Sequence, residues 1–284
     1  MSAPVRPTIT FLTDFGLDGA AAVCRGVMLS ICPDAIVIDI THSIRKYAVH
    51  DAAWILRAAL PFMPPGVHVA VVDPGVGTTR RGLAIQAERG DVLIGPDNGL
   101  LPAAAEALGG VRAARALENP AWFLPEVSAT FHGRDIFAPV AAHLAAGHAT
   151  FDELGPVIPA HELVRLTDPE PQVEPGALRT EVTYVDSFGN IRIAGGAADL
   201  SRALGALADG APLEVSFEAV NGHPPAVEAT RWNATFGVVS AGASLLYTDS
   251  SGGLALADNQ GSAATRLGVS PGRALRITRR GAGA

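Results

Sequence analysis

Residues 67–81, VHVAVVDPGVGTTRR, provide the clearest strand and loop in the first half of the chain. The valine-rich run 67–72 is apolar apart from His68 and is followed by Asp, Pro and Gly, which is typical of a strand buried on both faces. Similar strand-like and helix-like segments precede it in alternation: 8–12, 20–31, 35–40 and 49–60. Buried strands that alternate with helices predict a parallel sheet covered on both sides.

The same alternation continues beyond residue 81 and then stops. Further strands are expected at 83–87 and 92–94, and helices from Leu100 and at 136–146. After Gly147, prolines crowd a stretch of weak periodicity and indicate a linker: Pro156, Pro159, Pro169, Pro171 and Pro175.

Beyond the linker, the segments are short, strand-like and separated by turn signals. Strands are expected at 179–185, 191–193, 213–217, 234–239, 244–247, 255–257 and 274–277. This pattern is typical of a small antiparallel barrel or sandwich. The predicted fold is therefore an α/β domain with a mostly parallel sheet in residues 1–165, followed by a smaller antiparallel β-barrel-like domain in residues 166–284.

The composition of the 284 residues excludes several classes of protein. Hydrophobic residues make up 48% and charged residues 17%, which is unlike a disordered chain. The net charge of −7 gives no basic footprint for nucleic acid. No apolar run reaches the ~18 residues of a membrane helix, and the start lacks the pattern of a signal peptide. Cys24 and Cys32 are too few for a disulfide framework or a multi-cysteine zinc site, so we expect core residues in a cytoplasmic protein.

Polar side chains follow three of the predicted strands. Asp14 comes after the first, Thr41 and His42 after the second, and Asp73 after the third. Because ligands of open α/β sheets bind beyond the carboxyl ends of the strands, these residues are candidates for a site. The alternative is that Asp73 only caps a turn.

The loop after Asp73 adds glycines and cations to this edge of the sheet. Gly75 and Gly77 permit unusual backbone angles and close approach of a ligand. Arg80 and Arg81 follow within reach, although both arginines are also compatible with an ordinary surface position.

Two more loops carry candidate groups, each with a structural alternative. GPDNG at 95–99 is an ordinary turn sequence whose Asp or Asn caps the next helix in the simpler interpretation. SATFHGRDIFAP at 128–139 places three ionisable side chains at a helix start: His132, Arg134 and Asp135. Asp135 is alternatively the N-cap. VDSFGN at 185–190 and DSSGGLALADNQG at 249–261 look like hairpin loops.

Several standard catalytic motifs are absent from the sequence. It has no H-E-x-x-H, no EF-hand loop, no Walker loop, no G-x-S-x-G elbow and no G-x-G-x-x-G fingerprint. What remains is a set of Asp, Arg and His residues on glycine-rich loops. Such a set suits proton abstraction or charge stabilisation without a metal or a cofactor.

Together these motifs resemble one family over most of the chain. TDFG, DITHSI, VVDPGVGTTRR, GPDNGLL, FHGRDIFAPVAA, VDSFGN and the C-terminal S-x-G-x-L-x-x-A-x-N-Q-G element occur in the order found in the S-adenosylmethionine (SAM) hydrolases. These enzymes are also called SAM hydroxide adenosyltransferases and are related to the SAM-dependent fluorinase and chlorinase. The resemblance runs from about Ile9 to Leu267.

The resemblance implies a homotrimer in which SAM lies between the N-terminal domain of one chain and the C-terminal domain of its neighbour. It also implies that Asp73, Arg80 and His132 activate water. The halogenating relatives have a tyrosine and a threonine where this chain has Asp73 and Val76, and this departure favours water over halide.

The resemblance further implies a set of substrate contacts. Asp14 matches the carboxylate that binds the ribose hydroxyls, Tyr47 an aromatic residue of the ribose pocket, and Phe131 a residue at the reacting centre. The C-terminal residues that match the family are Asp186 for the methionine ammonium, Asn190 and Gln260 for adenine, and Ser250 and Ser251 for the methionine carboxylate. Halogenases have an arginine at the position of Ser251.

The implied reaction converts SAM and water to adenosine and L-methionine, with SAM as substrate and no metal or cofactor. Because an Asp beside an Arg is a weaker base, His132 is the better proton acceptor of the three by ordinary pKa values. The partners expected are SAM and its products, with no nucleic acid and no membrane. The alternatives are a SAM-dependent halogenase that forms 5′-chloroadenosine and a non-catalytic SAM or adenosine sensor.

Overall fold

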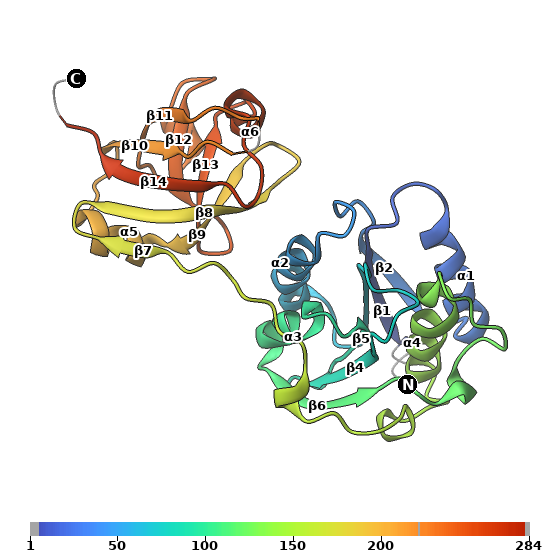
Figure 1. The fold of residues 1–284 in the computed structure, drawn as a ribbon. Helices are drawn as coiled ribbons and strands as arrows, with labels where there is room; N and C mark the ends of the chain where they lie inside the picture. The colour runs from blue at the N-terminus through green and yellow to red at the C-terminus, as the bar shows by residue number, and fades with distance from the viewer. Residues whose placement is uncertain (1–5, 221, 282–284) are drawn as a thin grey trace, which may run out of the picture. The chain divides into compact units, whose positions relative to one another are not determined.

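The computed structural model describes residues 6–220 and 222–281 of the chain. These residues form two compact units that divide between Leu166 and Thr167, each with its own sheet (Figure 1). Among the described residues, no helix has the length and apolar character needed to cross a lipid bilayer.

The N-terminal unit is a six-stranded sheet between two pairs of helices. Its main elements are β1 (Thr8–Thr13), α1 (Ala20–Ile31), β2 (Ile36–Thr41), α2 (Val49–Ala59), β3 (Val67–Val71), β4 (Gly82–Ala87), β5 (Val92–Pro96), α3 (Leu100–Ala105), β6 (Val111–Ala116) and α4 (Ala138–Ala145). The strand order is β2-β1-β3-β5-β4-β6. The first four strands are parallel, whereas β4 is antiparallel to both of its neighbours. The predicted α/β class is confirmed, with a mixed sheet.

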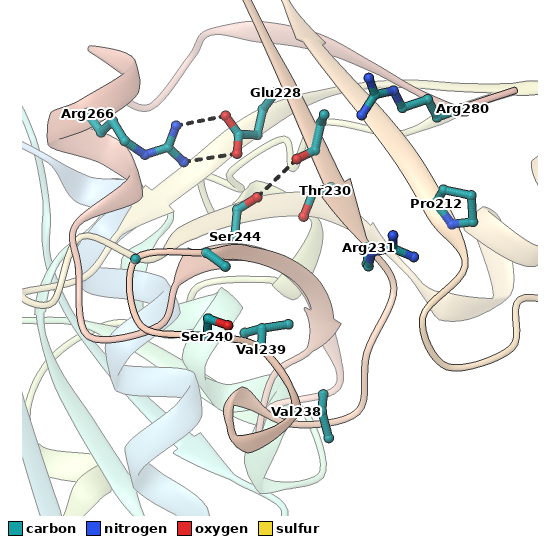
Figure 2. A pocket seen from close by; sticks show the side chains of 13 residues that line it. Pro212, Glu228, Thr230, Arg231, Val238, Val239, Ser240, Ser244, Arg266 and Arg280 are labelled. Carbon is teal, nitrogen blue, oxygen red and sulfur yellow. Dashed lines mark hydrogen bonds and ion pairs between the residues drawn. The ribbon is translucent and has the colours of Figure 1, made fainter. Parts of the chain in front are cut away.

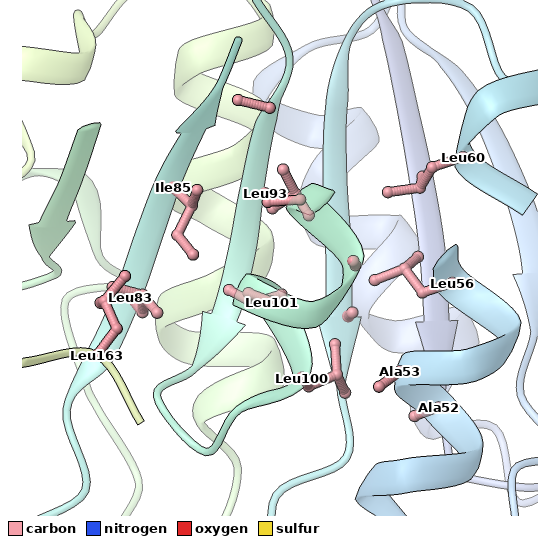
Figure 3. Packing of buried hydrophobic residues seen from close by; sticks show 14 of the residues in the cluster. Ala52, Ala53, Leu56, Leu60, Leu83, Ile85, Leu93, Leu100, Leu101 and Leu163 are labelled. Carbon is pink, nitrogen blue, oxygen red and sulfur yellow. The ribbon is translucent and has the colours of Figure 1, made fainter. Parts of the chain in front are cut away.

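Alternating side chains of the strands fill two separate cores. Leu12 of β1 packs with α2 and α3 on one face, whereas Phe11 packs with α1 and α4 on the other. Figure 3 shows the first of these cores, where Leu56 and Leu101 face the strands from their helices. Truncation of a fully buried leucine such as Leu56 costs about 2–5 kcal/mol. The cysteines Cys24 and Cys32 lie in the second core, as predicted.

Strand β6 was not expected from the sequence. Its residues, VRAARA, contain alanine and arginine, which favour helices when considered alone. Ala114 and Ala116 are nevertheless buried against β4, whereas Arg112 is exposed and Arg115 is half-buried. Position at the sheet edge therefore overrides the local preference.

The C-terminal unit is an antiparallel, nearly closed sheet, as predicted. Its elements are β7 (Gln172–Glu174), β8 (Ala177–Val185), β9 (Ile191–Gly196), α5 (Ala197–Leu204), β10 (Pro212–Phe217), β11 (Ala226–Arg231), β12 (Ser244–Thr248), β13 (Gly253–Asp258), α6 (Ala263–Leu267) and β14 (Ala274–Arg279). The order is β11-β10-β14-β8-β9-β13-β12, with β7 beside β8. The terminal strands β11 and β12 approach each other through the bridge between Trp232 and Leu246, which nearly closes the barrel.

One predicted strand of this unit is wrong. Residues 234–239 form a loop with a single 3₁₀ turn, Phe236–Val238, and the strand lies instead at Ala226–Arg231. The apolar residues that suggested a strand are not buried in the barrel, since Val238 is 62% exposed. The true strand was hidden because it follows two prolines and its Val227 points to solvent.

Candidate active site

Asp73, Arg80 and His132 meet beyond the carboxyl end of β3. Arg80 Nε donates to Asp73 Oδ1 at 3.0 Å, and its Nη2 donates to Asp73 Oδ2 at 2.5 Å. The same Nη2 lies 3.1 Å from His132 Nδ1. The side chains of Arg80 and Asp73 are only 9% and 6% exposed. The structure therefore brings together the three residues expected to activate water, and it joins them in a partly buried hydrogen-bonded chain.

The loop between Asp73 and Arg80 is held closely against the segment that carries His132. Gly77 has a φ of 76°, and a Cβ at this position would lie 2.5 Å from the carbonyl oxygen of Ala129. Only glycine meets both conditions without a shift of the backbone. Thr78 Oγ1 donates to the carbonyl of Gly75 at 2.7 Å and tightens the loop further.

Asn98 and Asp97 of the GPDNG loop hold the neighbourhood of Asp73 in place. Asn98 Nδ2 donates to the carbonyl oxygen of Val72 at 2.8 Å, one residue before Asp73. Asp97 is nearly buried and forms an ion pair with Arg81 at 2.7 Å. Arg81 and the GPDNG residues thus act as supports around the loop, in line with the structural interpretation of that turn.

Arg134 and Asp135 also have a supporting role. Asp135 is fully buried, pairs with Arg134 at 2.5 Å and accepts a hydrogen bond from the backbone N–H of Ser128 at 2.9 Å. Burial raises the pKa of Asp135, but the hydrogen bonds from Arg134 and Ser128 lower it by more. His132 precedes a π-helical turn, Gly133–Phe137, that leads into α4. π turns of this kind occur often at functional sites.

The environment of His132 favours the neutral imidazole. Burial lowers the pKa of His132 below its usual range, and Arg80 lowers it further, against smaller opposing effects of Asp73 and Asp135. Because a guanidinium N–H can only donate, Nδ1 of His132 accepts from Arg80. The neutral ring then carries its proton on Nε2, and Nε2 is a hydrogen-bond donor.

The residues expected at the ribose also lie together. Asp14 Oδ2 accepts a hydrogen bond from the backbone N–H of Tyr47 at 2.9 Å, and the carbonyl of Asp14 accepts from Lys46 Nζ at 2.7 Å. Tyr47 has a φ of 65°, and its ring is exposed. Phe131 contacts Phe15, next to Asp14, edge to face at 5.7 Å between ring centroids.

His42, a further strand-end candidate, is tied to its own sheet. Its Nδ1 lies 2.9 Å from Thr13 Oγ1, and its Nε2 lies 3.2 Å from Asp39 Oδ1. These contacts orient the end of β2 next to the end of β1.

Four of the predicted residues of the C-terminal unit lie on two hairpin turns, and Gln260 lies between β13 and α6. Asp186 accepts hydrogen bonds from the backbone N–H groups of Phe188 and Asn190, both at 2.9 Å, and from Asn190 Nδ2 at 2.7 Å. Asp186 and Asn190 are therefore brought together by the turn between β8 and β9. Ser250 and Ser251 are exposed on the turn between β12 and β13. Gln260 is exposed after β13, with a φ of 58°.

Sequence reasoning missed three residues near these turns: Arg192, Tyr247 and Asp249. Arg192 forms an ion pair with Asp249, and burial raises the pKa of Tyr247 to about 12, with Asp186 and Asp249 adding to the rise. The two-residue period of β9 would have found Arg192, which lies between the buried Ile191 and Ile193, whereas Asp249 follows the end of β12 and carries no such signal.

A separate groove of about 540 Å³ lies beside β11 in the C-terminal unit. Figure 2 shows that Arg266 forms an ion pair with Glu228 at the rim of the groove, with N···O distances of 2.8 and 3.1 Å. None of the residues predicted for substrate or catalysis lines this groove. Over the described residues, no three or more His, Cys, Asp or Glu side chains gather as a metal site would require.

Comparison with known proteins identifies the family. Residues 9–155 match the SAM hydroxide adenosyltransferase N-terminal domain, and residues 180–276 match the C-terminal domain of the same family. The chain belongs to the SAM hydroxide adenosyltransferase family. A relative from Salinispora tropica named (R)-S-adenosyl-L-methionine hydrolase is 47% identical over 273 residues, which cover 96% of this chain and 98% of the relative. The likeness predicted from the motifs is confirmed.

More distant members of the SAM hydroxide adenosyltransferase family extend the match. A Thermus thermophilus protein with the same hydrolase name is 38% identical over 96% of this chain and all of its own, and a fluorinase from Actinopolyspora mzabensis is 31% identical over 96% and 98%. A crystal structure of an uncharacterized conserved protein from Thermotoga maritima has a TM-score of 0.82 and 35% identity, with 95% of this chain and 100% of the other covered.

Proposed function

We propose that this protein hydrolyses SAM to adenosine and L-methionine by attack of water on C5′. The observation that carries the proposal is the partly buried hydrogen-bonded chain Asp73–Arg80–His132, in a fold whose relatives at 47% identity are named as SAM hydrolases. We propose that Asp14 and Tyr47 bind the ribose of SAM and that Asp186 binds the ammonium of its methionine half.

The leaving group of this reaction needs little assistance from the protein. The C5′–S bond breaks as the water oxygen forms its bond to C5′, and the electron pair neutralises the sulfonium to a thioether. One proton of the attacking water is then released. Neutral water is a weak nucleophile, so its placement in line with the C5′–S bond is the main task, and such orientation is worth ~7–11 kcal/mol. A positioned base contributes about 10²–10⁴-fold more.

We propose that Asp73 and Arg80 orient and polarise this water. Arg80 occupies one site on each carboxylate oxygen of Asp73, and a carboxylate has about four acceptor sites, so further sites remain for a water. We propose that His132 orients the water as a neutral ring and accepts no proton in this step. Since Arg80 engages its Nδ1, His132 holds the oxygen side of the water through Nε2–H, and the proton passes first to Asp73.

Hydrolysis in H₂¹⁸O tests the proposed function. We expect adenosine that carries one ¹⁸O atom at O5′ together with unlabelled methionine, both detected by mass spectrometry. Formation of 5′-chloroadenosine in the presence of chloride would show halogenation, which the carboxylate of Asp73 disfavours by repelling an anion. Binding of SAM without products would show a sensor. Either result contradicts the proposal.

We also propose that the protein is a homotrimer, as the family resemblance implies. Light scattering coupled to size-exclusion chromatography measures this directly, with the mass of 29.2 kDa per chain as reference. A monomer that hydrolyses SAM at full rate contradicts this assembly.

A further inference from the structure

The hydroxyl of Thr13 links His42 to the backbone around Asp14. Thr13 is fully buried at the end of β1. Its Oγ1 accepts a hydrogen bond from the backbone N–H of Phe15 at 3.1 Å and lies 2.9 Å from Nδ1 of His42. The first of these contacts spans Asp14, and the second ties the same hydroxyl to the residue that follows β2. The conformation at Asp14 is therefore coupled to the side chain of His42.

The ring of His42 is itself held in place. It packs edge to face on Phe11, with 4.9 Å between the ring centroids, and Phe11 is fully buried. Its Nε2 lies 3.2 Å from Oδ1 of Asp39, whose other oxygen pairs with Arg25 of α1. The side chain of His42 is only 16% exposed. The ring cannot turn away from Thr13 without losing both the aromatic and the charged neighbour.

The hydrogen-bonding roles at Thr13 are mutually consistent. The carboxylate of Asp39 beside Nε2 of His42 favours the ring proton on that nitrogen, which leaves Nδ1 as an acceptor. A hydroxyl offers one donor and two acceptor lone pairs. Thr13 therefore donates to His42 Nδ1 and keeps its lone pairs for the N–H of Phe15.

The main chain of His42 holds the same loop from a second point. Its carbonyl oxygen accepts a hydrogen bond from the backbone N–H of Gly16 at 2.7 Å. The contacts of His42 thus reach residues before and after Asp14. Because the carbonyl contact does not depend on the imidazole, a change of side chain at position 42 leaves it available.

The carboxylate of Asp14 has acceptor sites left for a ligand. Asp14 is 8% exposed, and its Oδ2 accepts one hydrogen bond from the backbone N–H of Tyr47. A carboxylate has about four acceptor sites. Two vicinal hydroxyls can both donate to it only when the carboxylate has the right position and tilt, so a small displacement of Asp14 costs binding.

We propose that His42 is a positioning residue, which holds Asp14 through Thr13 in the geometry that accepts both ribose hydroxyls. In this role His42 does not touch the substrate and contributes to recognition of the diol only through Asp14. This inference rests on the ribose role of Asp14 in the proposed function and deepens it by naming the residue that sets the position of that carboxylate.

Ligand discrimination tests the role of His42. Calorimetry measures the binding of adenosine and of 2′,3′-dideoxyadenosine, which lacks the two hydroxyls, to the wild type and to His42→Ala. The wild type should prefer adenosine. In His42→Ala we expect adenosine to bind about 10-fold more weakly, as for the loss of a hydrogen bond to a charged group, and dideoxyadenosine to stay within about twofold. Equal losses on both ligands, or no loss on either, overturn the proposal.

Two conservative variants separate this role from a general effect on the fold. His42→Asn places an amide where Nδ1 lies, next to Thr13, and should restore the preference for adenosine. His42→Gln places its amide where Nε2 lies and should not restore it. His161→Ala removes an exposed histidine and should leave the binding of both ligands unchanged. Circular dichroism melts establish that all variants fold. Equal behaviour of the Asn and Gln variants contradicts the role of Thr13.

A double-mutant cycle shows whether His42 acts through Asp14. Asp14→Ala alone should abolish the preference for adenosine, and His42→Ala should cause no further loss in that background, because residues that share one interaction are not additive. A second loss of about 10-fold in the double variant overturns the proposal. So does a full preference for adenosine in Asp14→Ala.

Steady-state kinetics keep this inference distinct from the proposed function. His42→Ala should raise the KM for SAM about 10-fold while kcat stays within about twofold. If SAM is not hydrolysed but the preference for adenosine depends on His42, the proposed reaction fails and the positioning role stands. If SAM is hydrolysed and His42→Ala keeps the KM of the wild type, the positioning role fails.

Discussion

Asp73 and Arg80 hold each other through two parallel hydrogen bonds, and this fork decides what the N-terminal site presents to a water molecule. Both side chains are nearly buried, so the charges are compensated at short range instead of by solvent. The third member, His132, contacts the fork only through Arg80. The arginine is thus the centre of the chain and the carboxylate its acceptor end.

Asp73→Asn tests this arrangement with very little change in the shape of the side chain. The amide keeps the volume but loses the negative charge and one acceptor, so we expect kcat for SAM hydrolysis to fall about 10²–10³-fold, with a smaller change in KM. Stopped assays of adenosine formation measure this. The control is Asp152→Asn, which removes a carboxylate that is 83% exposed and paired with Arg115. The assignment would be contradicted if Asp152→Asn lost activity while Asp73→Asn kept the kcat of the wild type.

The environment of His132 predicts how kcat/KM depends on pH. Burial and the neighbouring Arg80 lower its pKa below 6.5, so the ring is neutral at pH 7 and becomes charged only in more acidic solution. Protonation adds a proton at Nδ1 and breaks the contact with Arg80. We expect kcat/KM to be level from pH 7 to 8 and to fall as the pH drops below 6.5. The same group stabilises the fold less as pH falls there, because the unfolded chain binds the proton more readily.

The pH profile of His132→Gln is the comparison for this prediction. The variant should lose the acidic limb that His132 causes, with a lower rate throughout. An inflection of the wild type at or above pH 7 would show that His132 is not the titrating group.

At the scale of elements, a buried polar network joins the central strands of the N-terminal sheet. His68 of β3 lies 2.9 Å from Thr10 Oγ1 on β1 and 2.8 Å from Asp91 Oδ1, which precedes β5. Arg89 adds two hydrogen bonds to Asp91, and Gly66 a third. Because β3 ends at the loop of Asp73, this network fixes the strand that carries the site.

Asp91→Asn tests this network. Burial raises the pKa of Asp91, but hydrogen bonds from His68 and Arg89 lower it by more, so the carboxylate is ionised in the folded protein. Loss of one partner from a buried ion pair costs about 3–5 kcal/mol, and we expect that loss in the free energy of unfolding in urea at pH 7. The difference from the wild type should shrink as pH falls below the pKa of about 3.9 of an unfolded Asp. A destabilisation under about 1 kcal/mol at pH 7 would contradict this role.

At the scale of the whole molecule, the two units carry different halves of the proposed chemistry. Asp73, Arg80 and His132 belong to the N-terminal unit, and Asp186 belongs to the C-terminal unit. If the assembly is the proposed homotrimer with SAM held between neighbouring chains, each chain supplies half of two sites.

Mixing two inactive variants tests this sharing. Asp73→Asn damages the N-terminal half and Asp186→Asn the C-terminal half, so each variant alone should be inactive. In trimers assembled from both, about a quarter of the sites combine two intact halves, if subunits mix at random around the ring. We therefore expect the mixed trimers to form adenosine at about a quarter of the wild-type rate. Mixed trimers that form without recovery would place each site within one chain.

The sequence by itself determined the elements with unbroken apolar periodicity and the loops that follow them. Helix α1 and strands β1 and β3 are buried on the residues that the pattern selected, because hydrophobic burial depends directly on side-chain type. The strand-end argument marked Asp73, and Arg80 follows in the same loop, whereas His132 precedes a helix and was expected to join them from the family motifs.

Only the tertiary structure decided the remaining features. Strand β6, rich in alanine and arginine, and strand β11 owe their conformation to their neighbours in the sheet, while the apolar residues 234–239 remain in a loop. Arg192 and Tyr247 are both brought beside Ala255 by cross-strand pairing although they are far apart in sequence, since cross-strand register is a property of the whole barrel. Local sequence describes what each residue prefers, whereas contacts between distant strands determine which charged groups meet.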